Sequence, residues 1–360
     1  MNVAKKLLAM LLIAVFVLVP LSSCGAQLKL PKEEVVPEVI KKSYGEKLRE
    51  SIEVDPLYPD SPADDEELNI LFIGNSYSTH WPDELAELLG AAGYEDVLVC
   101  DIYHSGASFE DHWTWLQNNE KLEDFHINRP GQGGRVTWSD VSFEECVTYA
   151  NWDYISFQQT NKYTSNSGKF RTSISQWLPQ LYSYVYAAFP KATYFWQQNW
   201  SHSAGKGMYD NTETSDEKLR WIRQEALIVC KDWGFLNAPL GQAWTDIRYD
   251  PLFYEHSGDY VNDYPTKSLH TRLYETTTKK GTITNADLSH DGNIGGGQYL
   301  NASVWFEMIT HKSVVGNSYV PEYYAEETNK TYTFTPEQIA KLQNAAHQAV
   351  LADYGEEWYK

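Results

Sequence analysis

A serine and a histidine that lie far apart in the chain have neighbours that suit nucleophilic catalysis. Ser76 follows an apolar run that ends in Gly74. A serine hydroxyl becomes a useful nucleophile only when a base lies within hydrogen-bond reach. His290 precedes a glycine-rich stretch, and Asp287 stands three residues before it. On a turn, that carboxylate can hold one imidazole nitrogen while the other faces the serine, which is the chemistry of a Ser-His-Asp acyl hydrolase.

The elements that must position these residues alternate between short apolar runs and amphipathic segments. This pattern indicates a parallel sheet covered by helices on both faces. We expect strands at 68–74, 97–103, 153–157, 192–197 and 236–240, and helices at 82–92, 173–189, 215–233, 297–310 and 336–352. Ligands of such sheets bind beyond the carboxyl ends of the strands. Ser76 directly follows the first strand, so the pattern places it where chemistry usually occurs.

The stretches around Ser76 and His290 resemble the first and last blocks of the SGNH or GDSL-like hydrolases. "FIGNSYS" matches a strand that ends in Gly-Asp-Ser or Gly-Asn-Ser, and "DLSHDGNIGG" matches Asp-x-x-His before a glycine and a helix. More narrowly, "ILFIGNSYS", "WDYISFQQ" and "SHDGNIGGGQYL" resemble the bacterial family called domain of unknown function 4886. The resemblance spans residues 68–310. It implies a flavodoxin-like three-layer α/β/α fold with a central parallel sheet, and ester hydrolysis without a metal or other cofactor.

The resemblance also implies an oxyanion hole, a set of donors for the negative charge that develops on an attacked carbonyl oxygen. In that superfamily, the amide of the nucleophile acts with a glycine after the second strand and an asparagine after the third. These roles would fall to Ser76, to Gly106 in "YHSGAS" and to Asn161 in "FQQTNK". Gln159 stands in place of the glycine of the asparagine block. The side-chain amide of Gln158 or Gln159 is therefore an alternative donor.

Two tryptophans near the expected fourth strand are candidates for substrate contacts. "FWQQNW" ends that strand, so Trp196 and Trp200 would rim the same crevice and stack on a sugar ring, with core packing as the alternative. The chain has 13 Trp and 25 Tyr, and flat amphipathic rings often line surfaces that bind sugars. This composition favours a carbohydrate substrate by association only.

The first 23 residues have the order of a bacterial lipoprotein signal peptide. Two lysines precede an apolar run at 7–19, and small residues then lead to Cys24, which would be lipidated and become the first mature residue. A secretory signal or a membrane anchor is the alternative, but the run is short for a span of about 20 residues. We expect a lipid-anchored protein of the bacterial cell envelope. Gly25 after the cysteine disfavours retention at an inner membrane.

The remainder divides into a tether and one hydrolase domain. Residues 24–67 are charged and proline-punctuated, which favours a linker with at most one short helix. Residues 68–360 would form the domain, with an insertion at about 246–285 that is too long for a simple connection. A C-terminal helical extension would occupy about 316–360.

Charge and cysteine usage exclude several classes of function. The formal net charge is −20, and removal of the two signal-peptide lysines makes the mature protein more negative. Such a protein repels nucleic acid and anionic lipid, so the lipid at Cys24 would be its only link to the membrane. The other cysteines, Cys100, Cys146 and Cys230, form no Cys-x-x-Cys pair. We expect buried thiols rather than a zinc site or a disulfide framework.

The sequence therefore favours a cell-envelope serine esterase that removes acetyl or other acyl groups from a carbohydrate. The first alternative is a glycan-binding lipoprotein that keeps the fold but has little or no catalysis. The second is a lipase or thioesterase, which should have a broad apolar crevice rather than a polar aromatic one.

Overall fold

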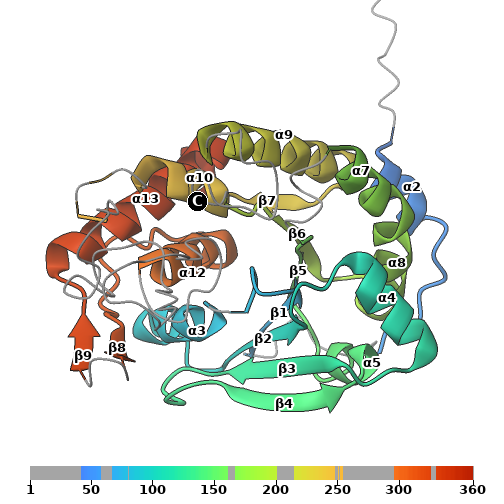
Figure 1. Ribbon diagram of the computed structural model, residues 1–360, viewed down its shortest axis with the longest axis horizontal. Helices are drawn as coiled ribbons and strands as arrows, with labels where there is room; N and C mark the ends of the chain where they lie inside the picture. The colour runs from blue at the N-terminus through green and yellow to red at the C-terminus, as the bar shows by residue number, and fades with distance from the viewer. Residues whose placement is uncertain are drawn as a thin grey trace, which may run out of the picture. The chain divides into compact units, whose positions relative to one another are not determined.

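A seven-stranded sheet forms the centre of residues 42–360, which make up one compact unit in the computed structural model (Figure 1). The structure describes residues 42–57, 67–79, 81–160, 167–200, 215–247, 250, 252–253, 296–325 and 330–359. Four residues of the predicted sites lie outside these ranges: Cys24, Asn161, Asp287 and His290. So does most of the predicted insertion at 246–285.

Five strands of the sheet are parallel and have the flavodoxin-like order. They are β1 (Leu68–Gly74), β2 (Val97–Tyr103), β5 (Tyr154–Phe157), β6 (Thr193–Gln197) and β7 (Leu236–Ala238). Their order across the sheet is β2-β1-β5-β6-β7. The chain reverses direction across the sheet between β1 and β5, which is the switch point where ligands of such sheets bind. The predicted fold class is confirmed.

An antiparallel pair that the sequence did not predict extends the sheet beyond β2. β3 (Glu123–Asn128) pairs with β2, and β4 (Val136–Val141) pairs with β3 at the edge. The residues of β4 are exposed or half-buried. An edge strand with so little buried surface produces no apolar run, so periodicity gave no signal for it.

Two hydrophobic clusters, one on each face of the sheet, define the three layers. The first involves α3 (Pro82–Ala91), α10 (Leu240–Ile247), α12 (Gly296–Thr310) and α13 (Pro336–Tyr354). The second involves α4 (Phe109–Asn118), α5 (Phe143–Val147), α7 (Ser167–Gln176), α8 (Leu178–Ala188) and α9 (Ser215–Trp233). Figure 1 shows α3 and α12 on one side of the strands and α4, α5 and α8 on the other.

The predicted helix at 173–189 is interrupted and becomes α7 and α8. Pro179 occupies the first turn of α8, and Trp177 is the residue before that helix. Proline lacks an amide hydrogen and its ring clashes with the carbonyl four residues earlier, so a helix restarts at proline rather than passing through it.

The segment predicted as a tether contains one short helix, α2 (Tyr44–Arg49), which packs on the domain. The Tyr44 and Trp233 rings meet edge to face at 5.1 Å. Arg49 donates to the Tyr182 hydroxyl at 3.1 Å and to the Trp233 carbonyl at 3.0 Å. The described unit therefore begins before the predicted boundary at residue 68.

Three further elements complete the described fold. β8 (Glu322–Ala325) and β9 (Lys330–Thr333) form a separate antiparallel pair, and a short 3-10 helix (Glu356–Tyr359) follows α13. Within the ranges that the structure describes, no helix combines the length and the apolar character needed to cross a bilayer.

Candidate active site

The turn that follows β1 is held by the side chain of Asn75. Its amide nitrogen donates to the Ala107 carbonyl at 2.8 Å, which ties the turn to the loop after β2. Its amide oxygen accepts from the Tyr77 amide at 3.1 Å, and its carbonyl accepts from the Ser78 amide at 2.8 Å. Asn75 is only 1% exposed. This residue therefore fixes the backbone on both sides of Ser76.

Gln158, directly after β5, supports the same turn from the other neighbouring strand. Its Oε1 atom accepts from the Asn75 amide at 3.0 Å and from the Ser78 hydroxyl at 3.2 Å. A Cβ atom at Gly74 would lie 2.4 Å from that oxygen and 2.7 Å from the Ser78 hydroxyl. A side chain at position 74 would collide with the side-chain amide of Gln158, so glycine suits this position.

Ser76 is held in this turn with its hydroxyl uncommitted. The residue is 7% exposed, and its hydroxyl makes no hydrogen bond to any residue in the described part of the chain. The predicted partners His290 and Asp287 lie outside the described residues, so the triad geometry stays a prediction. Tyr77 and Ser78, which flank the same turn, are committed to internal contacts.

The direction of α12 bears on where the His290 segment enters the fold. Near the end of α12, the Ile309 carbonyl accepts from the hydroxyl of Tyr154, the first residue of β5. Near the start, the Asn301 side chain accepts from Trp244 at 2.8 Å. The Trp244 ring stacks on Trp200 at 5.0 Å, and Trp200 packs on Tyr77 at 4.8 Å.

These contacts show that α12 runs antiparallel to the strands. Its last turn lies at the amino end of β5, and its first turns connect to the residue next to Ser76. Gly296, where α12 begins, is six residues after His290 in the sequence. The chain that carries His290 thus leads into the helix end that faces the carboxyl edge of the sheet.

The predicted oxyanion donors have different surroundings. Gly106 has φ +70° and is half-buried in the loop after β2, beside the Ala107 carbonyl that Asn75 contacts. Gln159 is engaged elsewhere, because its Nε2 atom donates to the Ser173 hydroxyl at 2.6 Å and its Oε1 atom accepts from the Thr160 amide at 2.7 Å. Asn161 lies outside the described residues. The roles of these donors stay predictions.

Replacement of Gly106 with Ala is expected to reduce turnover more than stability. A residue with a side chain in the left-handed region costs about 1–2 kcal/mol of stability. Alanine keeps the backbone amide, but relief of the strain at φ +70° would turn that amide away from the oxyanion, and an oxyanion donor typically contributes about 10²–10³-fold to kcat. Gly316 is the matched control, because it has φ +89° and open space around its Cβ position. Ester-hydrolysis kinetics and thermal melts of Gly106→Ala and Gly316→Ala will separate the two effects; equal turnover in both variants would remove Gly106 from the site.

Trp196 is not a substrate platform, contrary to the prediction. Its ring is 3% exposed and packs edge to face against Phe109 and Phe170, which face the second hydrophobic cluster. A ring enclosed by core residues has no face for a sugar. Trp200 is 4% exposed and stacks on Trp244, so one of its faces is taken, and its contact with a substrate stays a prediction.

Amide side chains from two strand ends form a polar wall beside the turn. Gln197, the last residue of β6, donates to the Tyr77 carbonyl at 2.7 Å and to the Asn199 side chain at 3.1 Å. Asn199 in turn donates to the Gln159 carbonyl at 3.0 Å. Sequence reasoning missed this wall. The available signal was the recurrence of Gln-Gln directly after two apolar runs, "FQQ" and "FWQQN".

His112 is a buried histidine that lies beside the turn. This histidine is fully buried in α4, where Nε2 lies 2.9 Å from the Gly74 carbonyl and Nδ1 lies 2.6 Å from Glu123 Oε1. Burial lowers the pKa of His112, but the charge and hydrogen bond of Glu123, with the Gly74 carbonyl, outweigh it and raise the pKa overall. His112 thus lies beside the Ser76 turn with both ring nitrogens in hydrogen-bond contact.

A buried Asp-His pair elsewhere in the described chain does not form a catalytic relay. His126 Nδ1 lies 2.8 Å from Asp101 Oδ2 and also 2.8 Å from the Thr79 hydroxyl. A relay needs the two ring nitrogens to face different partners, and here one nitrogen takes both. The pair therefore joins β2, β3 and the end of the Ser76 turn as a structural contact.

The described residues contain neither a metal site nor a reactive cysteine that could serve as an alternative catalytic centre. Those residues contain no group of three or more His, Cys, Asp or Glu that suits a metal ion. Cys100 and Cys146 are free and buried, and Cys230 is free and half-buried. Desolvation raises the pKa of each thiol. None of the three has the lowered pKa of a nucleophilic cysteine.

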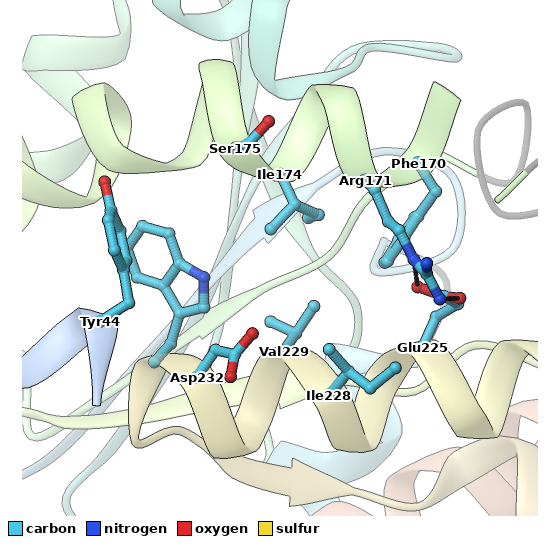
Figure 2. Close-up of a pocket in the computed structure, with 10 residues that line it drawn as sticks. Tyr44, Phe170, Arg171, Ile174, Ser175, Glu225, Ile228, Val229 and Asp232 are labelled. Carbon is cyan, nitrogen blue, oxygen red and sulfur yellow. Dashed lines mark hydrogen bonds and ion pairs between the residues drawn. The ribbon is translucent and has the colours of Figure 1, made fainter. Parts of the chain in front are cut away.

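A pocket of about 520 Å³ lies between α7 and α9 (Figure 2). Apolar side chains form its walls, and Arg171 pairs with Glu225 at 2.7 Å across one end. Its lining residues are Tyr44, Phe170, Arg171, Ile174, Ser175, Glu225, Ile228, Val229, Asp232 and Trp233. Neither Ser76 nor Gly106 contributes to it.

Comparison with known proteins shows which family model the segment that carries most of the sheet resembles. Residues 69–228 match the family model described as domain of unknown function (DUF4886). A crystal structure of a DUF4886 family protein from Bacteroides uniformis is similar, with 21% identity, a TM-score of 0.61, and coverage of 81% of this chain and 96% of that one. A search of curated proteins found no match.

Two more distant structures have TM-scores too low to bear on fold or activity. A Slackia heliotrinireducens protein, provisionally described as an SGNH hydrolase, has 19% identity and a TM-score of 0.40, with 67% of this chain and 98% of that chain covered. An extracellular lipase from Streptomyces rimosus has 14% identity and a TM-score of 0.30, with 49% and 82% covered. The family match supports the resemblance seen in the motifs: residues 69–228, the segment that carries Ser76 and Gly106, match the DUF4886 family model.

Proposed function

We propose that this protein is a serine hydrolase that cleaves ester bonds, with Ser76 as nucleophile, His290 as base and Asp287 as the residue that orients the histidine. The observation that carries the proposal is the direction of α12. The helix starts at the carboxyl edge of the sheet, six residues after His290, and its first turns connect through Trp244 and Trp200 to the Ser76 turn. The Ser76 hydroxyl, which makes no hydrogen bond to the described residues, supports the same assignment.

The proposed reaction has two steps of the acyl-enzyme type. Ser76 Oγ attacks the ester carbonyl while His290 takes its proton, and the amides of Ser76 and Gly106 donate to the resulting oxyanion. Collapse of this intermediate breaks the bond to the alcohol, which leaves with the proton from His290. A water molecule then attacks the acyl-enzyme with His290 again as base, which releases the acid and restores the serine.

The proposed substrate is a carbohydrate that carries acetyl or other acyl esters. Support comes from the aromatic content of the chain, because flat amphipathic rings often line surfaces that bind sugars. The proposed setting is the bacterial cell envelope, with the protein anchored by a lipid at Cys24. The lipoprotein signal motif is the support for this setting.

A substrate screen tests the proposal. The unit from residue 42 onward and its Ser76→Ala variant are assayed against acetylated mono- and oligosaccharides, acylated lipids and thioesters, alongside labelling by a fluorophosphonate probe. Release of acetate from sugars by the parent protein only, with labelling at Ser76, supports it. Absence of labelling, together with oligosaccharide binding that survives Ser76→Ala, would instead identify a glycan-binding protein. Preference for long acyl chains would identify a lipase or thioesterase.

A further inference from the structure

His112 has an unusual role for a helix residue, because it joins three segments around the proposed nucleophile. It projects from α4 to the last carbonyl of β1, at Gly74, and to Glu123 on β3. The loop that leads into α4 contains Gly106 and Ala107, and Asn75 ties that loop to the same turn. Two bonds therefore connect the nucleophile turn with the segment of the proposed oxyanion donor.

The chemistry of the contacts fixes the hydrogen at one position. A backbone carbonyl only accepts, so the short contact with the Gly74 oxygen requires a hydrogen on Nε2. Glu123 Oε1 holds Nδ1, and the other oxygen of this carboxylate has no hydrogen-bond partner among the described residues. The pair excludes water, since both side chains are 0% exposed.

The surroundings of His112 hold its ring in one orientation. Glu123 faces it from β3 and Asp111 lies on its own helix, while the Phe143 ring of α5 and the Trp115 ring pack beside the imidazole, each 5.8 Å from its centre. A charge-assisted hydrogen bond in such an environment is shorter and stronger than a neutral one. The Gly74 carbonyl, two residues before Ser76, is therefore held by a buried imidazole ring whose other nitrogen contacts Glu123.

We propose that His112 is a positioning residue for Ser76: its Nε2 atom, with Nδ1 held by Glu123, fixes the Gly74 carbonyl and so the turn that presents the nucleophile. This inference rests on the proposed function. His112 does not touch the reacting atoms, and its effect is on the placement of the hydroxyl. Misplacement of a catalytic group by about 1 Å can lower turnover about 100-fold.

A matched pair of double variants tests the proposal. His112→Gln with Glu123→Gln keeps a donor at position 112, and His112→Met with Glu123→Gln removes it. Gln and Met are of similar length, and both variants remove the buried imidazole and carboxyl groups. We expect kcat for the Met variant to be about 10- to 100-fold below that of the Gln variant, with KM values within about threefold of each other. Equal kcat values in the two folded variants would overturn the proposal.

Nuclear magnetic resonance of the parent protein gives a test that needs no variant. In protein labelled with ¹⁵N-histidine, the His112 signal, assigned through its contacts to Phe143 and Trp115, should show a hydrogen on Nε2 throughout the pH range of activity. An Nε2 atom without a hydrogen would overturn the proposal. Absence of Ser76 labelling in the parent protein would instead overturn the proposed function itself.

Discussion

Replacement of Ser76 with Ala is expected to lower kcat on an acetyl ester by about four orders of magnitude or more while leaving the fold intact. The hydroxyl makes no hydrogen bond to the described residues, so its removal leaves no buried group unpaired there. The turn itself is held by Asn75 and Gln158, whose contacts to the backbone remain. Steady-state hydrolysis and a thermal melt of the purified variant are the measurements.

Ser78 offers the matched control, because it is another serine in the same turn. Its hydroxyl lies 3.2 Å from Gln158 Oε1 and 3.3 Å from Gln197 Oε1, and it is 1% exposed. Ser78→Ala should therefore cost about 1 kcal/mol of stability through the lost hydrogen bond, and lower kcat far less than Ser76→Ala. Full activity in Ser76→Ala, or a greater loss of kcat in a folded Ser78→Ala, would contradict the assignment of the nucleophile.

Strands buried on both faces were the elements that the sequence predicted best. β1 and β2 are mostly apolar and buried, and their predicted bounds match the structure from Leu68 to Gly74 and from Val97 to Tyr103. α9 also has its predicted bounds, and it ends before Gly234, which has φ +70°. In these segments the apolar pattern and the residues at the segment ends, such as Gly234, indicate the same bounds.

Elements with little buried surface could not be predicted in the same way. β4 has no buried residue, and its pairing with β3 depends on backbone hydrogen bonds that leave no apolar pattern. The break between α7 and α8 was missed because apolar spacing continues across Pro179. Both the pairing of β4 and the break between α7 and α8 also depend on packing against residues that are far apart in sequence.

The candidate site shows the same division between local and distant information. The motif around Ser76 is local, so the sequence placed this serine at the end of a strand. Asn75, Gln158 and His112 act through bonds to segments that lie 32, 83 and 38 residues away. Trp196 was misassigned because its place at a strand end did not reveal which face of the sheet its ring occupies. The fold decides which residues become hydrogen-bond partners when they are this far apart in sequence.

Replacement of His290 with Ala is expected to lower kcat by about four orders of magnitude, a loss similar to that of Ser76→Ala, because the two residues act as one unit. Labelling of Ser76 by a fluorophosphonate should slow in parallel, since the serine loses its base. His270→Ala, in the same stretch of sequence, is the control and should retain activity. Wild-type kcat/KM should also fall as acid protonates the base, whereas a profile that is flat from about pH 5 to 8 would argue against a histidine.

The two aspartates that flank His290 sharpen the test of the third triad member. Asp287 stands three residues before the histidine and Asp291 directly follows it. The Asp-x-x-His motif assigns the orienting role to Asp287, so Asp287→Asn should lower kcat by about 10²–10⁴-fold and Asp291→Asn should have little effect. The reverse result would move the role to Asp291. Full activity in His290→Ala would remove the base from this segment, and with it the argument that the direction of α12 brings the segment to the Ser76 turn.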